Sequence, residues 1–244
     1  MHPVLLNIGA FELPTYGVFV AVAWLAGVRW LSARRREMGL SEDELWSLIY
    51  WIFAGAFFGG KLFYLALSPD PWSWSISSLR YGFVFYGGLA GTLMAGWWWC
   101  RRQGRSFYRT ADYTLTALAM GHGIGRLGCL AAGCCYGRHA DVPWAVAMAG
   151  DLARHPTQLY EALLNFVLFA LLSRFAIPRV RDGRWPPGSA LWCYVLGYAL
   201  LRFCIEFFRG DDRGSFHAGL SPSQWVALMS ATAVLAILSR RRGA

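Results

Sequence analysis

Residues 45–67 read LWSLIYWIFAGAFFGGKLFYLAL, a run of 23 residues in which Lys61 is the one charged side chain. About 20 consecutive apolar residues span the hydrocarbon core of a bilayer as a helix. The run is therefore long enough to cross a membrane. Six further segments follow the same pattern, so we expect seven transmembrane helices at 14–33, 45–67, 83–100, 111–130, 157–175, 188–207 and 222–239.

The composition of the chain supports this pattern. Hydrophobic residues make up 56% and charged residues 15%, whereas roughly 25% of a soluble domain is charged. One core cannot hide so much apolar surface, so lipid must cover the rest. We therefore predict an all-α integral membrane protein with one polytopic domain over 1–244. The start MHPVLLNIGAFELP lacks a basic n-region and a small-x-small cleavage site, so no cleaved signal peptide is expected.

The formal charge of +9 comes from 22 arginines and Lys61. Nucleic-acid binding is one explanation for a basic chain, but these arginines sit in short clusters between apolar runs, as topology signals do. Alternate loops carry fifteen and six arginines, and positive residues mark the cytoplasmic side. The N-terminus is therefore expected outside and the C-terminus in the cytoplasm. The fifteen are Arg29, Arg34, Arg35, Arg36, Arg101, Arg102, Arg105, Arg109, Arg174, Arg179, Arg181, Arg184, Arg240, Arg241 and Arg242; the six are Arg80, Arg126, Arg138, Arg154, Arg209 and Arg213.

This alternation also supports the fourth segment, 111–130, which is the weakest because Asp112, His122 and Arg126 interrupt it. Six helices would break the arginine pattern, so we keep seven. The outer side then holds three small polar segments. We expect the protein to lie in the cell inner membrane with these segments facing the periplasm. They are 68–82, 131–156 and 208–221.

The stretch from 121 to 138, GHGIGRLGCLAAGCCYGR, combines glycines with polar groups. Glycine permits close helix packing and close approach of the backbone to a ligand. Arg126 follows His122 by one helical turn, so both point the same way. Arginine suits bidentate phosphate contact, and a nearby histidine can accept a proton at neutral pH. We interpret this stretch as part of a site, against the alternative of plain helix packing.

The cysteines of the same stretch leave several interpretations open. In an oxidising compartment a disulfide is the default, and Cys129 could pair with Cys134 or Cys135, since adjacent cysteines do not easily pair with each other. Packed free thiols and a reactive thiol are the alternatives. A zinc site with His139 is weaker, because C-x4-C-C matches no common ligand spacing. We therefore expect a disulfide or thiol cluster and no metal.

Two further motifs carry charge near the expected outer side. Arg202 and Glu206 are spaced i, i+4, with Arg209 three residues further, so they share one helix face. They are either a mutually neutralised ion pair or a cationic site in which Glu206 holds the guanidinium. The second motif, HPTQLYE at 155–161, indicates a helix start at Pro156 and is weak on its own.

Six elements, in this order along nearly the whole chain, resemble those of the phosphatidylglycerol–prolipoprotein diacylglyceryl transferase family. Seven helices with the N-terminus outside is also the topology of that family. The six elements are Tyr16-Gly17, Gly60-Lys61-Leu62, Phe85-Tyr86-Gly87-Gly88-Leu89, Gly125-Arg126-Leu127-Gly128, the stretch from His155 to Leu164, and Arg202-Phe203 with Glu206-Phe207-Phe208-Arg209.

The resemblance implies a transferase that moves the diacylglyceryl group of phosphatidylglycerol to the lipobox cysteine thiol of a prolipoprotein, forming a thioether. Its partners would be phosphatidylglycerol, prolipoprotein signal peptides and the lipid bilayer, with no cofactor and no nucleic acid. The residues assigned to catalysis are His122, Arg126, Arg202 and Glu206. Those assigned to substrate binding are Tyr16, Tyr86, Gly87, Gly88, Arg209, His155, Gln158 and Tyr160.

The sequence departs from the family at three positions. Cys129 stands where the family has Asn, Cys134 where it has an acidic residue, and Tyr86 where it has His. Since the histidine of the third-helix element is missing, we expect His122 to act as the base. The departures leave two alternatives open: a related enzyme that uses a phospholipid donor with another acceptor, and a non-enzymatic lipid-binding homologue.

Overall fold

The described part of the chain forms two compact units. The first consists of Met1–Trp30 with Asp112–Ala244, and the second of Leu31–Ala111. Helices α1 (Thr15–Met38) and α5 (Phe107–Ala132) each contribute residues to both units. The single domain expected from the sequence stays a prediction. The residues that this computed structural model describes are 3–9, 11–67, 82–148, 152–211 and 216–242.

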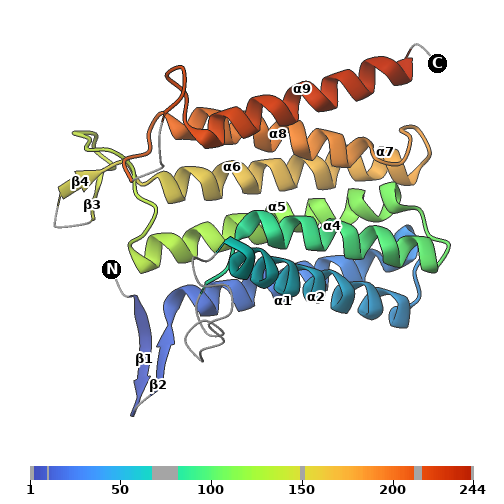
Figure 1. The fold of residues 1–244 in the computed structure, drawn as a ribbon, viewed down its shortest axis with the longest axis horizontal. Helices are drawn as coiled ribbons and strands as arrows, with labels where there is room; N and C mark the ends of the chain where they lie inside the picture. The colour runs from blue at the N-terminus through green and yellow to red at the C-terminus, as the bar shows by residue number, and fades with distance from the viewer. Residues whose placement is uncertain (1–2, 10, 68–81, 149–151, 212–215, 243–244) are drawn as a thin grey trace. The chain divides into compact units, whose positions relative to one another are not determined.

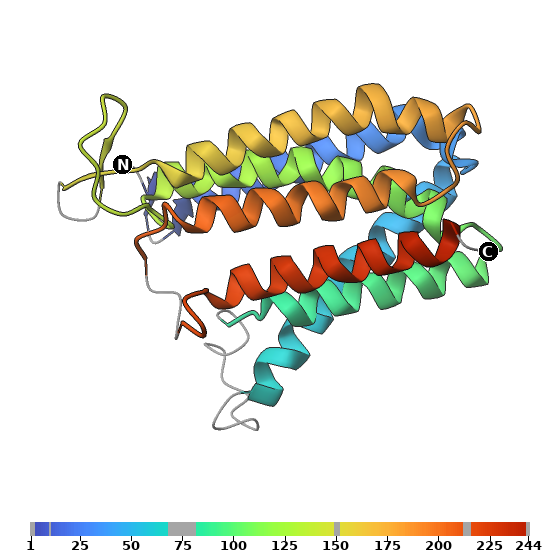
Figure 2. The same cartoon turned by 90° about the horizontal axis from the view of Figure 1, so that it is seen from above.

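The first unit is mainly helical. Helix α8 packs against both α6 and α9, and the three run side by side in Figures 1 and 2. A π-helical turn, Leu172–Ala176, continues α6 directly into the short α7. Together they form one helical segment that the sequence predicts as a single helix at 157–175. The bounds are α6 Thr157–Leu171, α7 Ile177–Arg181, α8 Ser189–Glu206 and α9 Pro222–Arg242.

Two small antiparallel β-hairpins lie beside these helices. The predicted all-α class does not include them. The first pairs β1 (Val4–Ile8) with β2 (Phe11–Pro14), and the second pairs β3 (Val146–Met148) with β4 (Leu152–Arg154). All four strands have five residues or fewer. They lie before the first helix and in the segment 131–156, so the membrane-length segments remain helical.

The second unit contains α2 (Glu42–Leu67) and α4 (Phe85–Arg102), packed closely against each other. Glycines make this approach possible. A Cβ added at Gly55 would lie 2.7 Å from Ala95 Cβ, and one at Gly59 would lie 3.0 Å from Gly91 Cα. Real side chains rarely tolerate such contacts, so α4 approaches the α2 backbone closely where Gly55 and Gly59 carry no side chain.

Asp112, a charge that interrupts the fourth predicted segment, has a structural partner. Its side chain is fully buried. Oδ2 accepts a hydrogen bond from the Gly188 amide at 2.7 Å, and Oδ1 accepts one from the Leu191 amide at 2.8 Å. A carboxylate at a helix N-terminus satisfies free amides and complements the helix dipole. Asp112 of α5 therefore caps α8, which accounts for a charge within an apolar helix.

Each of the seven predicted segments overlaps a helix of the described residues. Within the described parts of the chain, five helical segments are long and apolar enough to cross a membrane: α1, α2, α6 with α7, α8 and α9. Large side chains on their surfaces, such as Phe58, Leu62 and Leu200, are exposed, as expected for helices that face lipid. The count of seven stays a prediction. The described residues of the polar segments 131–156 and 208–221 connect helices, whereas 68–81 of the first polar segment lies outside the described residues.

Candidate active site

The centre of the site is a buried carboxylate, Glu161, which the α6 backbone places in its second turn. Three arginines from other parts of the chain converge on it. Arg126 Nε of α5 contacts Glu161 Oε2, and Arg202 Nη1 of α8 lies 3.1 Å from Oε1. Arg209 Nη1, just after α8, lies 3.8 Å from Oε1. The fold thus gathers three cations that are up to 83 residues apart in sequence around one anion.

Two arginines of this cluster have further carboxylate partners. Arg202 Nη2 lies 2.7 Å from Glu206 Oε2, the i, i+4 pair predicted from the sequence. Arg209 donates through Nε and Nη2 to both carboxylate oxygens of Asp211, at 2.9 and 2.6 Å. Three guanidinium groups therefore face three carboxylates. Buried charges require such pairing, and Arg126, whose side chain is 16% exposed, is the most accessible of the three arginines.

Two polar atoms of the arginine cluster remain available to a ligand. Among the residues that the structure describes, four buried atoms of the cluster have no hydrogen-bond partner. Arg126 Nε and Glu206 Oε2 lie in close ion pairs with Glu161 and Arg202. This leaves Glu206 Oε1 and Arg209 Nη1, whose ion-pair contact with Glu161 Oε1 is 3.8 Å long. Buried polar atoms are otherwise almost always paired. One is an acceptor and the other a donor, so the cluster can accept a hydrogen bond from a hydroxyl and donate one to an anionic oxygen.

His122 lies one turn before Arg126 on α5, as the sequence predicts. Its ring packs against the ring of Tyr198 on α8, with centroids 5.1 Å apart and planes at 31°. Tyr198 in turn stacks on Tyr194 at 5.9 Å. The histidine therefore lies beside Arg126 and packs against the stacked rings of Tyr198 and Tyr194. Its assignment as the base stays a prediction.

The motif at 155–161 holds the loop that follows α5. Gln158 is fully buried, and its Nε2 donates to the Cys134 carbonyl at 2.6 Å. Thr157 Oγ1 donates to the Cys135 carbonyl at 3.0 Å. His155 Nδ1 and Tyr160 Oη lie 3.1 Å apart. The side chains of Gln158 and Thr157 thus fix the loop backbone, a role that the sequence does not reveal; substrate binding by His155, Gln158 and Tyr160 stays a prediction.

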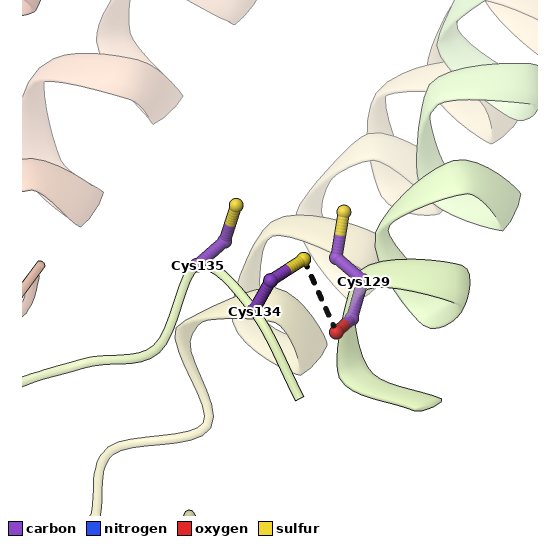
Figure 3. A group of neighbouring side chains, drawn as sticks. All are labelled: Cys129, Cys134 and Cys135. Carbon is purple, nitrogen blue, oxygen red and sulfur yellow. Dashed lines mark hydrogen bonds between the residues drawn. The ribbon is translucent and has the colours of Figure 1, made fainter. Parts of the chain in front are cut away.

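Cys129, Cys134 and Cys135 come together at the end of α5 (Figure 3). Their three sulfur atoms all lie within 4.8 Å of one another, and all three cysteines are free. Cys134 Sγ also contacts the Cys129 carbonyl oxygen at 3.7 Å. The structure thus brings together the predicted thiol cluster, while its disulfide alternative stays a prediction.

The two loop cysteines differ in acidity. A hydrogen bond from the Cys129 thiol, together with the charges of Arg209 and Arg126, lowers the pKa of Cys135 to about 5 although burial opposes this. Burial instead raises the pKa of Cys134, and the neighbouring Cys135 adds to that rise. At neutral pH, Cys135 is therefore a thiolate within the electrostatic reach of the arginine cluster.

The remaining predicted residues occupy two places, the first of which is the start of α1. Tyr16 is half exposed there, and its ring reaches Gly128 of α5, where a Cβ would lie 3.4 Å from the ring and 2.7 Å from Phe19 Cβ. Tyr16 therefore packs beside the part of α5 that carries Cys129.

Tyr86, Gly87 and Gly88 belong to the second unit, at the start of α4. Tyr86 is exposed. A Cβ at Gly87 would lie 2.9 Å from Phe63 Cγ, and one at Gly88 would lie 3.1 Å from Phe83 Cε1. The two glycines therefore serve helix packing within their own unit, and their binding role stays a prediction.

Glu161 is the central residue that the sequence interpretation did not assign. Nothing in the local pattern distinguishes it from any acidic residue in an early helical turn. The sequence feature that points to Glu161 is the number of charges. Glu206 alone cannot neutralise Arg126, Arg202 and Arg209, so further carboxylates are required. Glu161, within the HPTQLYE motif, and Asp211 supply them.

The apolar helices define a multi-pass membrane protein with a buried cluster of paired arginines and carboxylates. The chain belongs to the prolipoprotein diacylglyceryl transferase family, whose model matches residues 3–240. The resemblance inferred from six sequence elements is thereby confirmed.

The similarity to relatives from several bacteria extends over most of both chains. The chain is 36% identical over 245 residues to the phosphatidylglycerol–prolipoprotein diacylglyceryl transferase of Pseudoalteromonas atlantica, covering 92% of this chain and 83% of the relative. The protein of the same name from Pasteurella multocida is 34% identical over 221 residues, with 86% and 80% covered. That from Clostridium tetani is 29% identical over 243 residues, with 94% of each covered.

Proposed function

We propose that this chain transfers the diacylglyceryl group of phosphatidylglycerol to the lipobox cysteine thiol of prolipoproteins. The single observation that carries the proposal is the convergence of three arginines on the buried Glu161. A thiolate attacks the glycerol carbon that bears the phosphate, so a C–S bond forms while the C–O bond breaks. The products are a thioether on the acceptor and free glycerol phosphate.

The arginine cluster suits this reaction because charge grows on the phosphate as the C–O bond breaks. Fixed donors aimed at a developing anion stabilise a transition state without reorganisation. Arg126 is the most exposed of the three guanidinium groups, and Arg209 Nη1 has spare hydrogen-bonding capacity. Both are assigned to the phosphate. Glu206 Oε1 is free to accept a hydrogen bond from a hydroxyl of the glycerol head group.

His122 is assigned the proton of the acceptor thiol. It lies next to Arg126 on the same face of α5 and packs on Tyr198. A neutral imidazole beside cationic groups remains a proton acceptor at neutral pH. We assign supporting contacts with the lipid or the signal peptide to Tyr16, Tyr86, Gly87, Gly88, His155, Gln158 and Tyr160.

The arginine distribution supports seven membrane spans with the N-terminus outside. In this topology the site lies at the periplasmic side of the cell inner membrane, where phosphatidylglycerol of the outer leaflet has access. The segments 131–156 and 208–221, which adjoin the arginine cluster in the chain, then face the periplasm. A cysteine-substitution scan that labels periplasmic and cytoplasmic thiols separately tests the seven spans.

Complementation tests the function. In a strain depleted of its own diacylglyceryl transferase, expression of this chain is expected to restore diacylglyceryl-modified lipoprotein, measured by mass spectrometry of a reporter. The same chain with Arg126→Gln is the matched negative control. Absence of modified reporter at normal membrane expression would contradict the proposal and favour a phospholipid-using enzyme with another acceptor.

A further inference from the structure

The thiol cluster has the dimensions of a metal site. Cys129 lies in the last turn of α5, whereas Cys134 and Cys135 lie on the following loop (Figure 3). Their sulfur atoms lie within 4.8 Å of one another. In tetrahedral zinc sites each Zn–S bond is about 2.3 Å, which places the ligand sulfurs about 3.8 Å apart. Side-chain rotations that close the cluster by about 1 Å would therefore satisfy zinc.

The loop backbone is already fixed in the conformation that brings the thiols together. Gln158 and Thr157 hold the carbonyl groups of Cys134 and Cys135, and the Cys134 amide donates to the Cys129 carbonyl at 3.1 Å. Cys135 adopts φ 63°, a left-handed conformation that non-glycine residues rarely adopt. The sequence spacing C-x4-C-C looked unsuitable for a metal, and this turn is the reason why the sulfurs nevertheless converge.

We propose that Cys129, Cys134 and Cys135 bind one zinc ion through three thiolates and leave its fourth position to the acceptor thiol. This inference rests on the proposed function. Thiolates select thiophilic ions such as zinc and copper(I). Zinc fits the reaction because it is not redox-active, and sites with three protein ligands keep a fourth position open for substrate.

The charges around the cluster suit this assignment. Three thiolates on Zn²⁺ carry one net negative charge. Arg126 lies about one turn before Cys129 on α5, and Arg209 pairs with Gly137, two residues after Cys135. The same two arginines are assigned to the phosphate of the donor lipid. A thiolate on the zinc would therefore lie close to the phosphate whose neighbouring carbon it attacks.

The reaction step balances without a further reactant. The acceptor thiol replaces water on the zinc and gives its proton to His122, the base assigned above. Binding to a metal ion deprotonates a thiol. The bound sulfur then attacks the glycerol carbon, the C–S bond forms, and glycerol phosphate leaves with the electrons of the broken C–O bond.

Metal content of the purified full-length protein tests the site. After incubation with Zn²⁺ under reducing conditions and removal of free ion, we expect about one zinc per wild-type chain. The variants Cys129→Ser, Cys134→Ser and Cys135→Ser are expected to lose it. The matched controls Cys193→Ser and Cys204→Ser, whose thiols lie outside the cluster, are expected to keep it. Equal zinc in wild type and in the triple-serine variant would overturn the proposal.

Cobalt substitution tests the open position on the wild-type chain, so the result does not depend on whether variants fold. Co²⁺ is expected to give thiolate-to-metal charge-transfer absorption that changes when a lipobox peptide is added. The same peptide with Ser in place of its cysteine should leave the spectrum unchanged. An identical spectrum with both peptides would overturn the assignment of the fourth position.

Transfer assays separate this inference from the proposed function. Wild-type protein stripped of zinc by a chelator is expected to lose at least tenfold in transfer from phosphatidylglycerol and to regain it with Zn²⁺. Full transfer by the zinc-free protein would overturn the inference and leave the proposed function intact. Zinc binding with thiol-dependent cobalt spectra but without any transfer would support the metal site while contradicting phosphatidylglycerol as the donor.

Discussion

Arg202 of α8 and Glu161 of α6 are joined by a buried hydrogen bond of 3.1 Å between Nη1 and Oε1, across 41 residues of sequence. The bond ties the last turns of α8 to the second turn of α6, at the ends of the two helices where Arg126 and Arg209 also meet. Glu161 contacts all three arginines, whereas each arginine contacts only its own carboxylates. Glu161 therefore fixes the positions of the three guanidinium groups relative to one another.

Replacement of this shared carboxylate should destabilise the protein. In Glu161→Gln the shape is retained, but three guanidinium groups lose their common anion. Breaking a buried ion pair on one side costs about 3–5 kcal/mol. We expect a clear fall in the melting temperature in detergent. The control Asp182→Asn changes an exposed acid paired with Arg181 and should leave the melting temperature within error; an equal effect of both would contradict this role of Glu161.

Arg126 should affect transfer more than it affects stability, because it is the most exposed of the three. Arg126→Gln is expected to lower kcat/KM for phosphatidylglycerol by about 10²–10³, the usual loss for one donor to a developing anion. The assay follows transfer to a lipobox peptide. Arg101→Gln, an exposed arginine of α4, is the control for loss of charge. Unchanged transfer in folded Arg126→Gln would remove Arg126 from the phosphate site.

The base assignment predicts a loss of about 10²–10⁴ in transfer for His122→Gln at unchanged membrane expression. Glutamine keeps hydrogen-bonding capacity and approximate size but cannot take a proton. Tyr194→Phe keeps the ring that stacks on Tyr198 beside His122, so it serves as the control for a substitution in the same aromatic group. Wild-type transfer by His122→Gln would rule out His122 as the base.

The membrane helices could be predicted from the sequence because each is specified locally, by some 20 apolar residues such as 45–67. The cost of charge in a membrane singles out Arg126 and Arg202 in the sequence, and the structure brings them together with Arg209; the role of His122 stays a prediction. The partner of those arginines could not be predicted, since Glu161 is selected by contacts from α5 and α8 that only the folded chain makes. The convergence of Cys129 with Cys135 likewise depends on a left-handed turn at Cys135 and on Thr157 of α6, which binds the Cys135 carbonyl.

The role of Asp112 also could not be predicted from the sequence. There it is a charge that interrupts an apolar segment, whereas in the structure it caps the N-terminus of α8. Asp112→Ala removes the acceptor for the Gly188 and Leu191 amides and should destabilise the protein by about 2–3 kcal/mol. Asp112→Asn keeps one acceptor oxygen and should lose less. Thermal unfolding measures both, with Ser189→Ala, an exposed hydroxyl at the same helix start, as control. A larger loss in Asn than in Ala would contradict the capping role.

The acidity of Cys135 predicts an unusual pH dependence of alkylation in the metal-free protein. Its pKa is lowered to about 5 by the Cys129 thiol and by Arg209 and Arg126. The thiolate, which is the reactive form, therefore predominates above about pH 5 and is lost as the pH falls through that value.

With iodoacetamide and peptide mass spectrometry, the rate of alkylation at Cys135 should level off above about pH 6. The rate at Cys134, whose pKa is raised, should still increase at pH 9. In Cys129→Ala the donor of this hydrogen bond is lost, so the plateau at Cys135 should move to higher pH. A rate at Cys135 that rises in parallel with that at Cys134 would show that neither the thiol nor the arginines stabilise its thiolate.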